Sequence, residues 1–340
     1  PCLYRLSLLT LLYVDLKVVY IRCLSNLAFL YIVTNPTLFI PVDTLIYLTS
    51  LGISNHGNTN SLVRHYYACK EVGIKPIMGV EAYFLPKWKE HERGYHLCLY
   101  AKNNAGYTNL NTLQFEGEKQ KYYNPIIDFA LLEKYHDGLI CTSACVAGYL
   151  AQSINAGKIT QAEKFIEKMI SIFGDDFYIE IQPYAVSDEG LQEKINVESI
   201  KLAQKYGVKC ILTSDSHYGS KDDFDTYMKM HEIAKHSPDW IEGTYAERYM
   251  PTEKELKVRF YKMHKKDFGS DDAKIAADKM IANLEEIESK VDDNILDSFD
   301  IVSIVGELCD AYEKYGKSVV GIEEVPDELV VKYCSLKVEK

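Results

Sequence analysis

The stretch LTSDSHYG, residues 212–219, places two good metal ligands directly after an apolar run. Asp215 and His217 follow the residues VKCIL at 208–212, which we expect to form a buried strand. Because alternate residues of a strand point to the same face, the two side chains are expected to face one point in space. A polar turn after a strand would give the same pattern, so the prediction depends on whether other strands end in the same way.

Helix and strand patterns alternate from residue 61 onward, which favours parallel βαβ units. Predicted strands cover 74–84, 95–101, 139–145, 177–184 and 208–214. Predicted helices cover 61–73, 124–138, 160–174, 190–207 and 270–291. Thr160 and Glu163 have the spacing of a capping box at the start of the third of these helices. This arrangement predicts an α/β protein with a closed or nearly closed TIM-like barrel.

In such barrels the chemistry takes place where the strands end. Residue types that bind metals lie at the predicted ends of several strands: His56, Glu81, His96, Cys145, Asp215 and His217. Each has an ordinary explanation on its own, as Cys145 does if it is a small buried hydrophobic residue. Carboxylate, imidazole and thiolate groups at the same end of successive strands together predict a zinc or mixed transition-metal site.

Five stretches of the chain resemble the PHP (polymerase and histidinol phosphatase) domain of bacterial DNA polymerase III alpha subunits, over about residues 50–295. They are NHGNTNSLVRHYYACKEVGIKPIMGVEAYF, YHLCLYAKNNAGYTNLNTL, GLICTSACVAGYLAQSINAG, FYIEIQPY and KCILTSDSHY. The resemblance implies a distorted (β/α)7 barrel of the PHP type that binds divalent metal ions, Zn or Mn/Fe. It also implies phosphodiester hydrolysis of the 3′→5′ exonuclease type, with a DNA 3′ end or a nucleotide phosphate as substrate and the remainder of a replicative polymerase as partner.

Six metal ligands of the family carry over, onto His56, Glu81, His96, Cys145, Asp215 and His217. The family's opening H-x-H pair has no counterpart, and Asn55 stands where the family has an aspartate. In the family, the residues matching Glu81, His96 and Cys145 serve one ion, so this set alone is complete here. We therefore expect at most one tightly bound ion, with the fourth coordination position open as in catalytic zinc sites. The resemblance assigns no catalytic residue beyond these ligands.

The net charge of −11 argues against a basic nucleic-acid clamp, because affinity for phosphates is carried by clustered Lys and Arg. Nine scattered cysteines without a C-x-x-C pair indicate reduced thiols and a cytoplasmic location. The charge-free run 23–42 is interrupted by prolines and polar residues, and we expect no membrane segment there. The predicted organisation is an atypical apolar segment at 1–50, the barrel at 51–295, and an extension at 296–340 that contains no polymerase palm.

Three functions stay open at this point. The six ligands favour a metal-dependent phosphoesterase. The missing H-x-H pair and Asn55 favour a catalytically degenerate barrel that serves as a scaffold or interaction module of a replicative polymerase. A small-molecule phosphatase of the histidinol-phosphate type shares the barrel. The histidines that match no ligand are expected at the surface or in turns: His65, His91, His136, His231, His236 and His264.

Overall fold

The computed structural model describes residues 49–184, 190–233, 243 and 245–297. The expectations for the first fifty residues, for His236 and for most of the 296–340 extension lie outside these residues. The chain divides into two units, one ending at Asp293 and the other beginning at Asn294. The fold below is that of the first unit.

The strands are β1 (Ser50–His56), β2 (Lys75–Leu85), β3 (Tyr95–Ala101), β4 (Ile126–Asp128), β5 (Leu139–Thr142), β6 (Phe177–Ile181) and β7 (Lys209–Leu212). The helices are α4 (Leu62–Glu71), α5 (Asn104–Glu118), α6 (Phe129–Tyr135), α7 (Tyr149–Asn155), α8 (Ile159–Phe173), α9 (Leu191–Tyr206), α10 (Phe224–Ile233), α12 (Glu253–Phe268) and α13 (Ser270–Lys290). Short 3₁₀ turns lie at Gly174–Asp176 and Lys221–Asp223.

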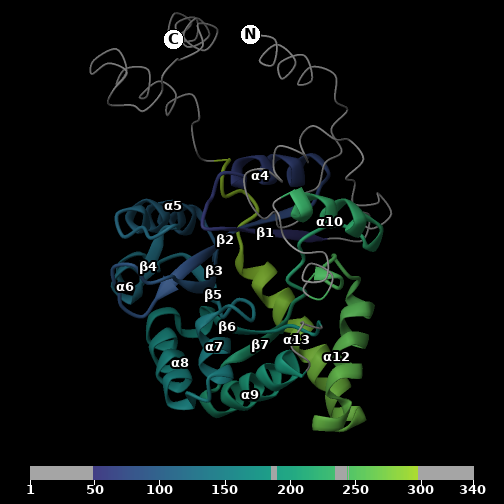
Figure 1. Cartoon of the computed structure of the whole chain (residues 1–340). Coiled ribbons are helices and arrows are strands. Elements are labelled where there is room, and N and C mark those ends of the chain that lie inside the picture. Colours follow the sequence, from purple (N-terminus) through teal and green to yellow (C-terminus); the bar gives the residue numbers. More distant parts are fainter. Residues whose placement is uncertain (1–48, 185–189, 234–242, 244, 298–340) are drawn as a thin grey trace, which may run out of the picture. The chain divides into compact units, whose positions relative to one another are not determined.

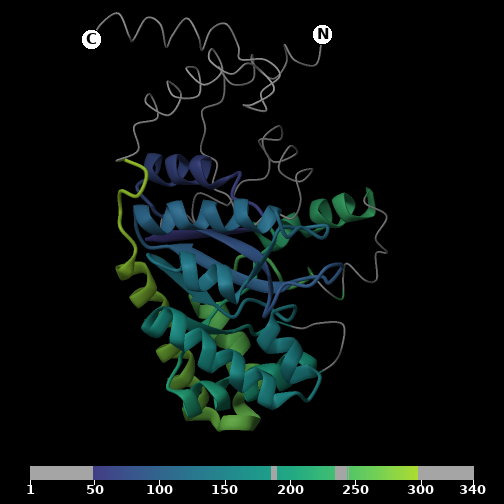
Figure 2. The ribbon, with the colours of Figure 1, turned by 90° about the vertical axis from the view of Figure 1, so that its left-hand side faces the viewer.

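The seven strands form one sheet in the order β1-β2-β3-β5-β6-β7, and β4 pairs with β2. Figures 1 and 2 show the sheet curled, with helices packed along its outside. The predicted fold class, an α/β distorted TIM-like barrel of the PHP type, is confirmed. Within the described part of the chain β1 and β7 each pair with one strand, so the curled sheet is open between them.

The prediction of parallel units was wrong for β3, which runs antiparallel to both β2 and β5. The loop between β2 and β3 connects neighbouring strands directly, and such a connection needs no crossover helix. As a result the first residues of β3 lie beside the last residues of β2, with Tyr95 opposite Phe84. The reversal of β3 therefore brings its beginning, where His96 lies, to the edge where β1 ends.

Two local predictions also need correction. Helix α8 begins one residue before Thr160, and its N-cap Lys158 makes no side-chain cap bond, so the predicted capping box is absent. The predicted helix at 124–138 is instead the short strand β4 followed by α6. The carboxylate of Asp128 ends β4 and caps α6 by accepting a hydrogen bond from the Leu131 amide. Helices α5, α7, α10 and α12 were not among the predicted elements.

Helix α13, predicted at 270–291, buries one stripe of apolar side chains that includes Ala273, Ala277, Met280 and Ile287. The helix packs against β7 and α12. Its Glu286 forms an ion pair with Lys209 of β7, with Oε2 2.6 Å from Nζ. Helix α13 therefore covers the last strand of the sheet, and α12 packs against α13.

Two histidines expected at the surface are buried. His65 is 1% exposed, and its Nε2 lies 2.9 Å from the Leu51 carbonyl oxygen. His264 is fully buried on α12, where Nδ1 lies 3.0 Å from an oxygen of Asp267 and Nε2 lies 3.1 Å from the amide nitrogen of Asn196 on α9. Both imidazoles join elements of the fold and lie outside the metal-ligand groups described below.

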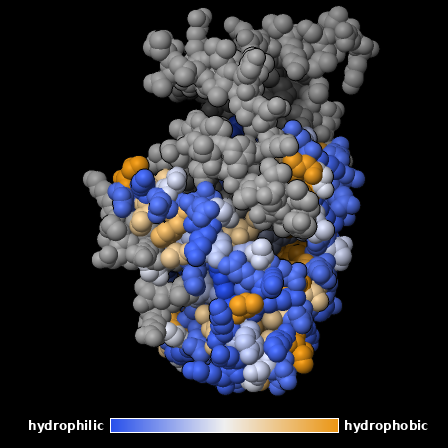
Figure 3. Space-filling view, turned by 90° about the vertical axis from the view of Figure 1, so that its right-hand side faces the viewer, coloured by the Kyte–Doolittle hydropathy of each residue, from blue (hydrophilic) through white to orange (hydrophobic). Residues whose placement is uncertain are grey.

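The face of the molecule drawn in Figure 3 is mainly hydrophilic, with small separate hydrophobic patches among the described residues. Exposed apolar side chains on the neighbouring helices include Ile233 of α10 and Val258 of α12. Among the described residues, every helix is too short or too polar to cross a membrane.

Candidate metal centre

Strand register brings three of the predicted ligands together. His56, the last residue of β1, lies directly opposite Glu81 of the parallel strand β2. His96 lies opposite Tyr83 on antiparallel β3, and Tyr83 is two residues after Glu81, so His96 and Glu81 share a face of the sheet. The Glu81 side chain is fully buried, with Oε2 2.9 Å from Nδ1 of His56 and Oε1 3.1 Å from Nδ1 of His96. A carboxylate between two imidazoles is thus built into the sheet.

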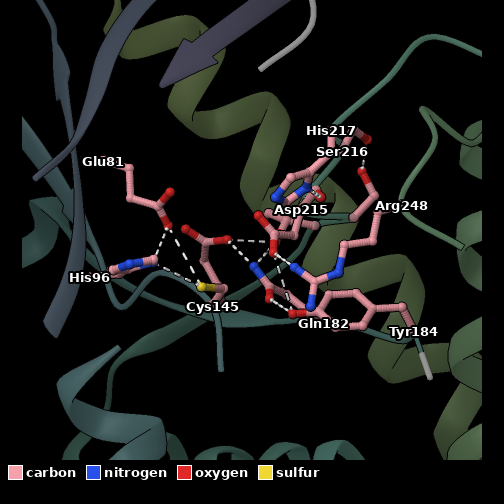
Figure 4. A network of polar contacts seen from close by, with 12 residues as sticks. Glu81, His96, Cys145, Gln182, Tyr184, Asp215, Ser216, His217 and Arg248 are labelled. Carbon is pink, nitrogen blue, oxygen red and sulfur yellow. Dashed lines mark hydrogen bonds and ion pairs between the residues drawn. The ribbon is translucent and has the colours of Figure 1, made fainter. Parts of the chain in front are cut away.

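Cys145 reaches this carboxylate from the loop after β5. Its Sγ lies 3.3 Å from His96 Nδ1 and 3.6 Å from Glu81 Oε1 (Figure 4). The loop is fastened to the start of β3, because the His96 amide donates to the Ala147 carbonyl over 3.0 Å. Gly148 makes this approach possible, since a Cβ there would lie 2.3 Å from the Ser143 carbonyl oxygen.

The charges around His96 favour a cation at this point. Burial lowers the pKa of His96, but the charge of Glu81 and hydrogen bonds to Cys145 and Glu81 outweigh burial and raise the pKa to about 10. In this state the imidazole carries a proton that balances its acidic neighbours. A divalent ion bound to the same donor atoms would take over that balancing role and release the proton.

Two of the strand ends at the centre have unusual backbone conformations. Ala144 has a φ of 60° and Asp215 a φ of 49°, both in the left-handed region. Aspartate tolerates this region better than alanine, for which it costs roughly 1–2 kcal/mol. Among the described non-glycine residues only two others have positive φ, and such outliers tend to cluster at functional sites.

The structural reason given for pairing Asp215 with His217 was wrong. Strand β7 ends at Leu212, and residues 213–217 follow it in irregular structure. His217 instead turns back, so that its Nδ1 lies 2.6 Å from the Asp215 carbonyl oxygen and donates to it. This bond places the ring proton on Nδ1, as histidines that bind metals through Nε2 commonly do.

The Asp215 carboxylate forms an ion pair with Arg248, and both side chains are buried. The Arg248 guanidinium lies 4.2 Å from the Tyr184 ring centre, and the Tyr184 hydroxyl donates to Gln182 Oε1 over 2.7 Å. Figure 4 shows Arg248 between Asp215 and the Tyr184 ring, on the opposite side of the centre from His96. Sequence reasoning missed Arg248, because a lone arginine in a polar stretch has no pattern that marks it as buried.

Further polar residues extend this side of the centre into the interior of the sheet. Gln182 Nε2 donates to Glu180 Oε2 over 2.9 Å, and the Thr213 hydroxyl donates to the same oxygen over 2.6 Å. A cavity of about 300 Å³ lined by Glu180, Thr213 and Asp215 lies beside them. Sequence reasoning did not predict this network. Glu180 and Gln182, which alternate with apolar residues in the stretch FYIEIQPY, are the pattern that could have indicated it.

Asn55 has a structural partner. It is 6% exposed, and its Nδ2 donates to the Ser61 hydroxyl, the N-cap residue of α4, over 2.5 Å. The amide that stands in place of a carboxylate therefore links β1 to the following helix.

Two sets of donor atoms each lie within 4.8 Å of one another: those of His56, Glu81 and His96, and those of Glu81, Cys145 and Asp215. Five of the six predicted ligands are thus brought together, and His217 belongs to neither set. The mixture of carboxylate, imidazole and thiolate donors fits a divalent transition-metal ion. Glu81 belongs to both sets and would be the common ligand.

Residues 47–184, which include His56, Glu81, His96 and Cys145, match the family model described as PHP domain. The resemblance of the sequence to that domain is therefore confirmed for this region. The curated relatives that match over it are DNA polymerase III alpha subunits. The subunit of Borreliella burgdorferi is 38% identical over 187 residues, which is 52% of this chain and 16% of the relative. The subunit of Aquifex aeolicus is 39% identical over 187 residues, 51% of this chain and 16% of the relative.

The matched region thus spans about 16% of the length of these relatives. A solved amidohydrolase from Chromobacterium violaceum aligns over 64% of this chain and 88% of its own, with a TM-score of 0.34 and 13% identity. Likeness at that level supports no further conclusion.

Proposed function

We propose that this chain is a metal-dependent phosphoesterase of the 3′→5′ exonuclease type, with an incomplete metal cluster. The observation that carries the proposal is the convergence of Glu81, His96 and Cys145, whose donor atoms lie 3.1–3.6 Å apart at the edge of the curled sheet. A divalent ion held there would supply Lewis acidity toward a phosphoryl oxygen.

The residues of the chain have separate tasks in this proposal. Glu81, His96 and Cys145 hold the ion, and the fully buried Glu81 lies between His96 and His56. The centre of the Tyr83 ring lies 5.3 Å from that of the His96 ring and 6.2 Å from that of the His56 ring, so Tyr83 lies beside both imidazoles. Burial and the charges of Glu81 and Cys145 raise the pKa of Tyr83, so its hydroxyl stays protonated and is available as a donor.

The substrate we propose is the 3′ end of DNA, or a nucleotide phosphate, by extension from the polymerase subunits that share this region. The rest of a replicative polymerase is the proposed partner, and the cytoplasm the proposed location. Residues 51–295 are the proposed catalytic domain, with 1–50 and 296–340 as separate segments. The net charge of −11 means that the bound ion, a partner or both must offset repulsion from a polynucleotide.

The test is release of 3′-terminal nucleotides from a labelled single-stranded primer, with Zn²⁺ or Mn²⁺ added to the metal-stripped chain. We expect cleavage that depends on the metal and that Glu81→Gln lowers at least about 100-fold, because the common ligand loses its charge. Glu118→Gln, on the exposed side of α5, is the matched control and should cleave like the parent. Equal cleavage by the Glu81→Gln chain would contradict the proposal.

A second candidate is a barrel that has lost catalysis and serves as a scaffold within a polymerase assembly. Two observations favour it: Asn55 is bonded to Ser61, and Asp215 is paired with Arg248. In each case a residue at a position that could bind a metal ion makes a structural contact instead. A chain that binds no divalent ion at all, yet folds cooperatively, would favour this candidate.

A further inference from the structure

Arg248 is an unusual residue for the wall of a metal centre. Its side chain is 6% exposed and that of Asp215 is 1% exposed, and the two form an ion pair through Nη1 and Oδ2. Asp215 is also one of the three residues whose donor atoms lie within 4.8 Å of one another. A fixed positive charge is therefore in contact with a carboxylate that an ion at this centre would use.

Arg248 is held in place by more than Asp215. Its guanidinium is stacked 4.2 Å from the ring centre of Tyr184 and 5.4 Å from that of Tyr245. Its carbonyl oxygen accepts a hydrogen bond from the His217 amide over 2.6 Å. The loop that carries Asp215 and His217 and the loop that carries Arg248 are thus joined at backbone and side chain.

We propose that Arg248 is a built-in counter-cation that replaces a divalent ion at Asp215 and so limits how many ions the centre holds. This inference rests on the proposed metal centre. An arginine in contact with a carboxylate stabilises its charged form without any metal, and it repels a further cation nearby. Asp215 is in contact with a permanent cation. By contrast, the Glu81 carboxylate lies between the imidazoles of His56 and His96, and Cys145 contacts His96.

A purely structural ion pair would have a different signature. Removing one partner of a buried pair leaves an uncompensated charge and lowers stability in either case. If the pair competes with a metal ion, loss of Arg248 should increase metal binding, and the added metal should restore the lost stability. A purely structural pair gives neither effect.

The test is calorimetric titration of the metal-stripped chain with Zn²⁺ and with Mn²⁺, comparing the parent with Arg248→Gln. We expect one tight ion in the parent, and in the variant a second ion bound about tenfold or more tightly than by the parent, as expected when a cation beside a carboxylate is removed. The melting temperature of the variant should also rise more on metal addition than that of the parent. The matched control is Arg259→Gln, since Arg259 likewise stacks on a tyrosine and pairs with a carboxylate, but outside the centre.

Equal affinity for the second ion in the parent and in Arg248→Gln would overturn the inference while leaving the proposed function intact. Absence of binding to either chain would overturn both. If Arg248→Gln fails to fold, Arg248→Met provides the test, because methionine removes the charge but keeps an unbranched side chain that can pack on the Tyr184 ring. Its second ion should then bind more tightly than in the parent, as in Arg248→Gln, and an affinity equal to that of the parent would contradict the proposal.

Discussion

The two sides of the candidate centre differ in how their charges are balanced. On one side Glu81 and Cys145 surround an imidazole whose pKa they raise to about 10 against the effect of burial. On the other side Asp215 is paired with the guanidinium of Arg248, and His217 is bonded to a backbone carbonyl. In the proposed metal centre the first side would exchange a proton for a metal ion, whereas the second already contains a permanent cation. Similar ligand residues in sequence therefore do not imply equal capacity to bind metal.

The largest expected effect comes from Cys145→Ser, which removes a thiolate from the first side. Loss of one ligand should weaken zinc binding by roughly a hundredfold to a thousandfold, because a quarter of the binding free energy of a four-ligand zinc site is about 2.5–4 kcal/mol. The fold should remain, since serine fits the space of cysteine. Chelator competition measures the affinity, and Cys210→Ser on β7 is the control for loss of a thiol elsewhere. If Cys145→Ser bound zinc as tightly as the parent, the proposed difference in metal binding between the two sides would be contradicted.

His65 sharpens the contrast with His96, because it is buried and its polar contacts within the described part of the chain are with the Leu51 carbonyl and the Cys69 thiol. Burial lowers its pKa to about 4, while a hydrogen bond to Leu51 partly offsets this. Below pH 6.5 the unfolded chain takes up a proton that the folded chain refuses, so stability should fall from pH 6.5 to about 4 and then stop falling on this account. The free energy of unfolding should fall by on the order of 3 kcal/mol over this pH range.

Denaturant unfolding across this pH range measures the effect, and His65→Gln should reduce the slope of stability against pH. His91→Gln is the control, because the side chain of His91 is 74% exposed. A slope unchanged by His65→Gln would show that other groups cause the acid sensitivity.

Asn55→Asp tests whether the centre binds a further ion when the carboxylate of the family is restored at this position. A charged ligand would replace a neutral one next to His56, and a further divalent ion should bind about tenfold more tightly. The Ser61 hydroxyl, which now accepts from Asn55, can donate to the new carboxylate instead. Titration with Mn²⁺ measures the gain, and unchanged affinity would mean that this carboxylate does not reach the centre.

The smallest effect concerns the backbone beside Cys145. Ala144 has a φ of 60°, so Ala144→Gly should relieve strain and raise the free energy of unfolding by less than about 1 kcal/mol. Ala162→Gly within α8 is the control and should lower stability by a similar amount. A loss of stability in Ala144→Gly would show that the left-handed conformation there carries no strain.

Strand and helix periodicity predicted most of the sheet, because β2, β5, β6 and β7 are apolar runs bounded by turn residues. It could not predict the direction of β3, since an apolar strand has the same pattern in either orientation. Residue types at strand ends indicated the candidate ligands, and five of the six have donor atoms that lie close together. Their role as ligands stays a prediction. The pairing of Asp215 with Arg248 was not, because it joins residues 33 positions apart through a buried contact that no local pattern encodes.

The number of divalent ions held by each chain tests the central claim most directly. Native mass spectrometry of the intact chain, after metal stripping, reloading with excess Zn²⁺ and removal of loosely bound ions, would report it. We predict one ion per chain, lost in Cys145→Ser and retained in Asp215→Asn. No bound ion, or one lost in Asp215→Asn but kept in Cys145→Ser, would contradict the assignment of the binding side to Glu81, His96 and Cys145.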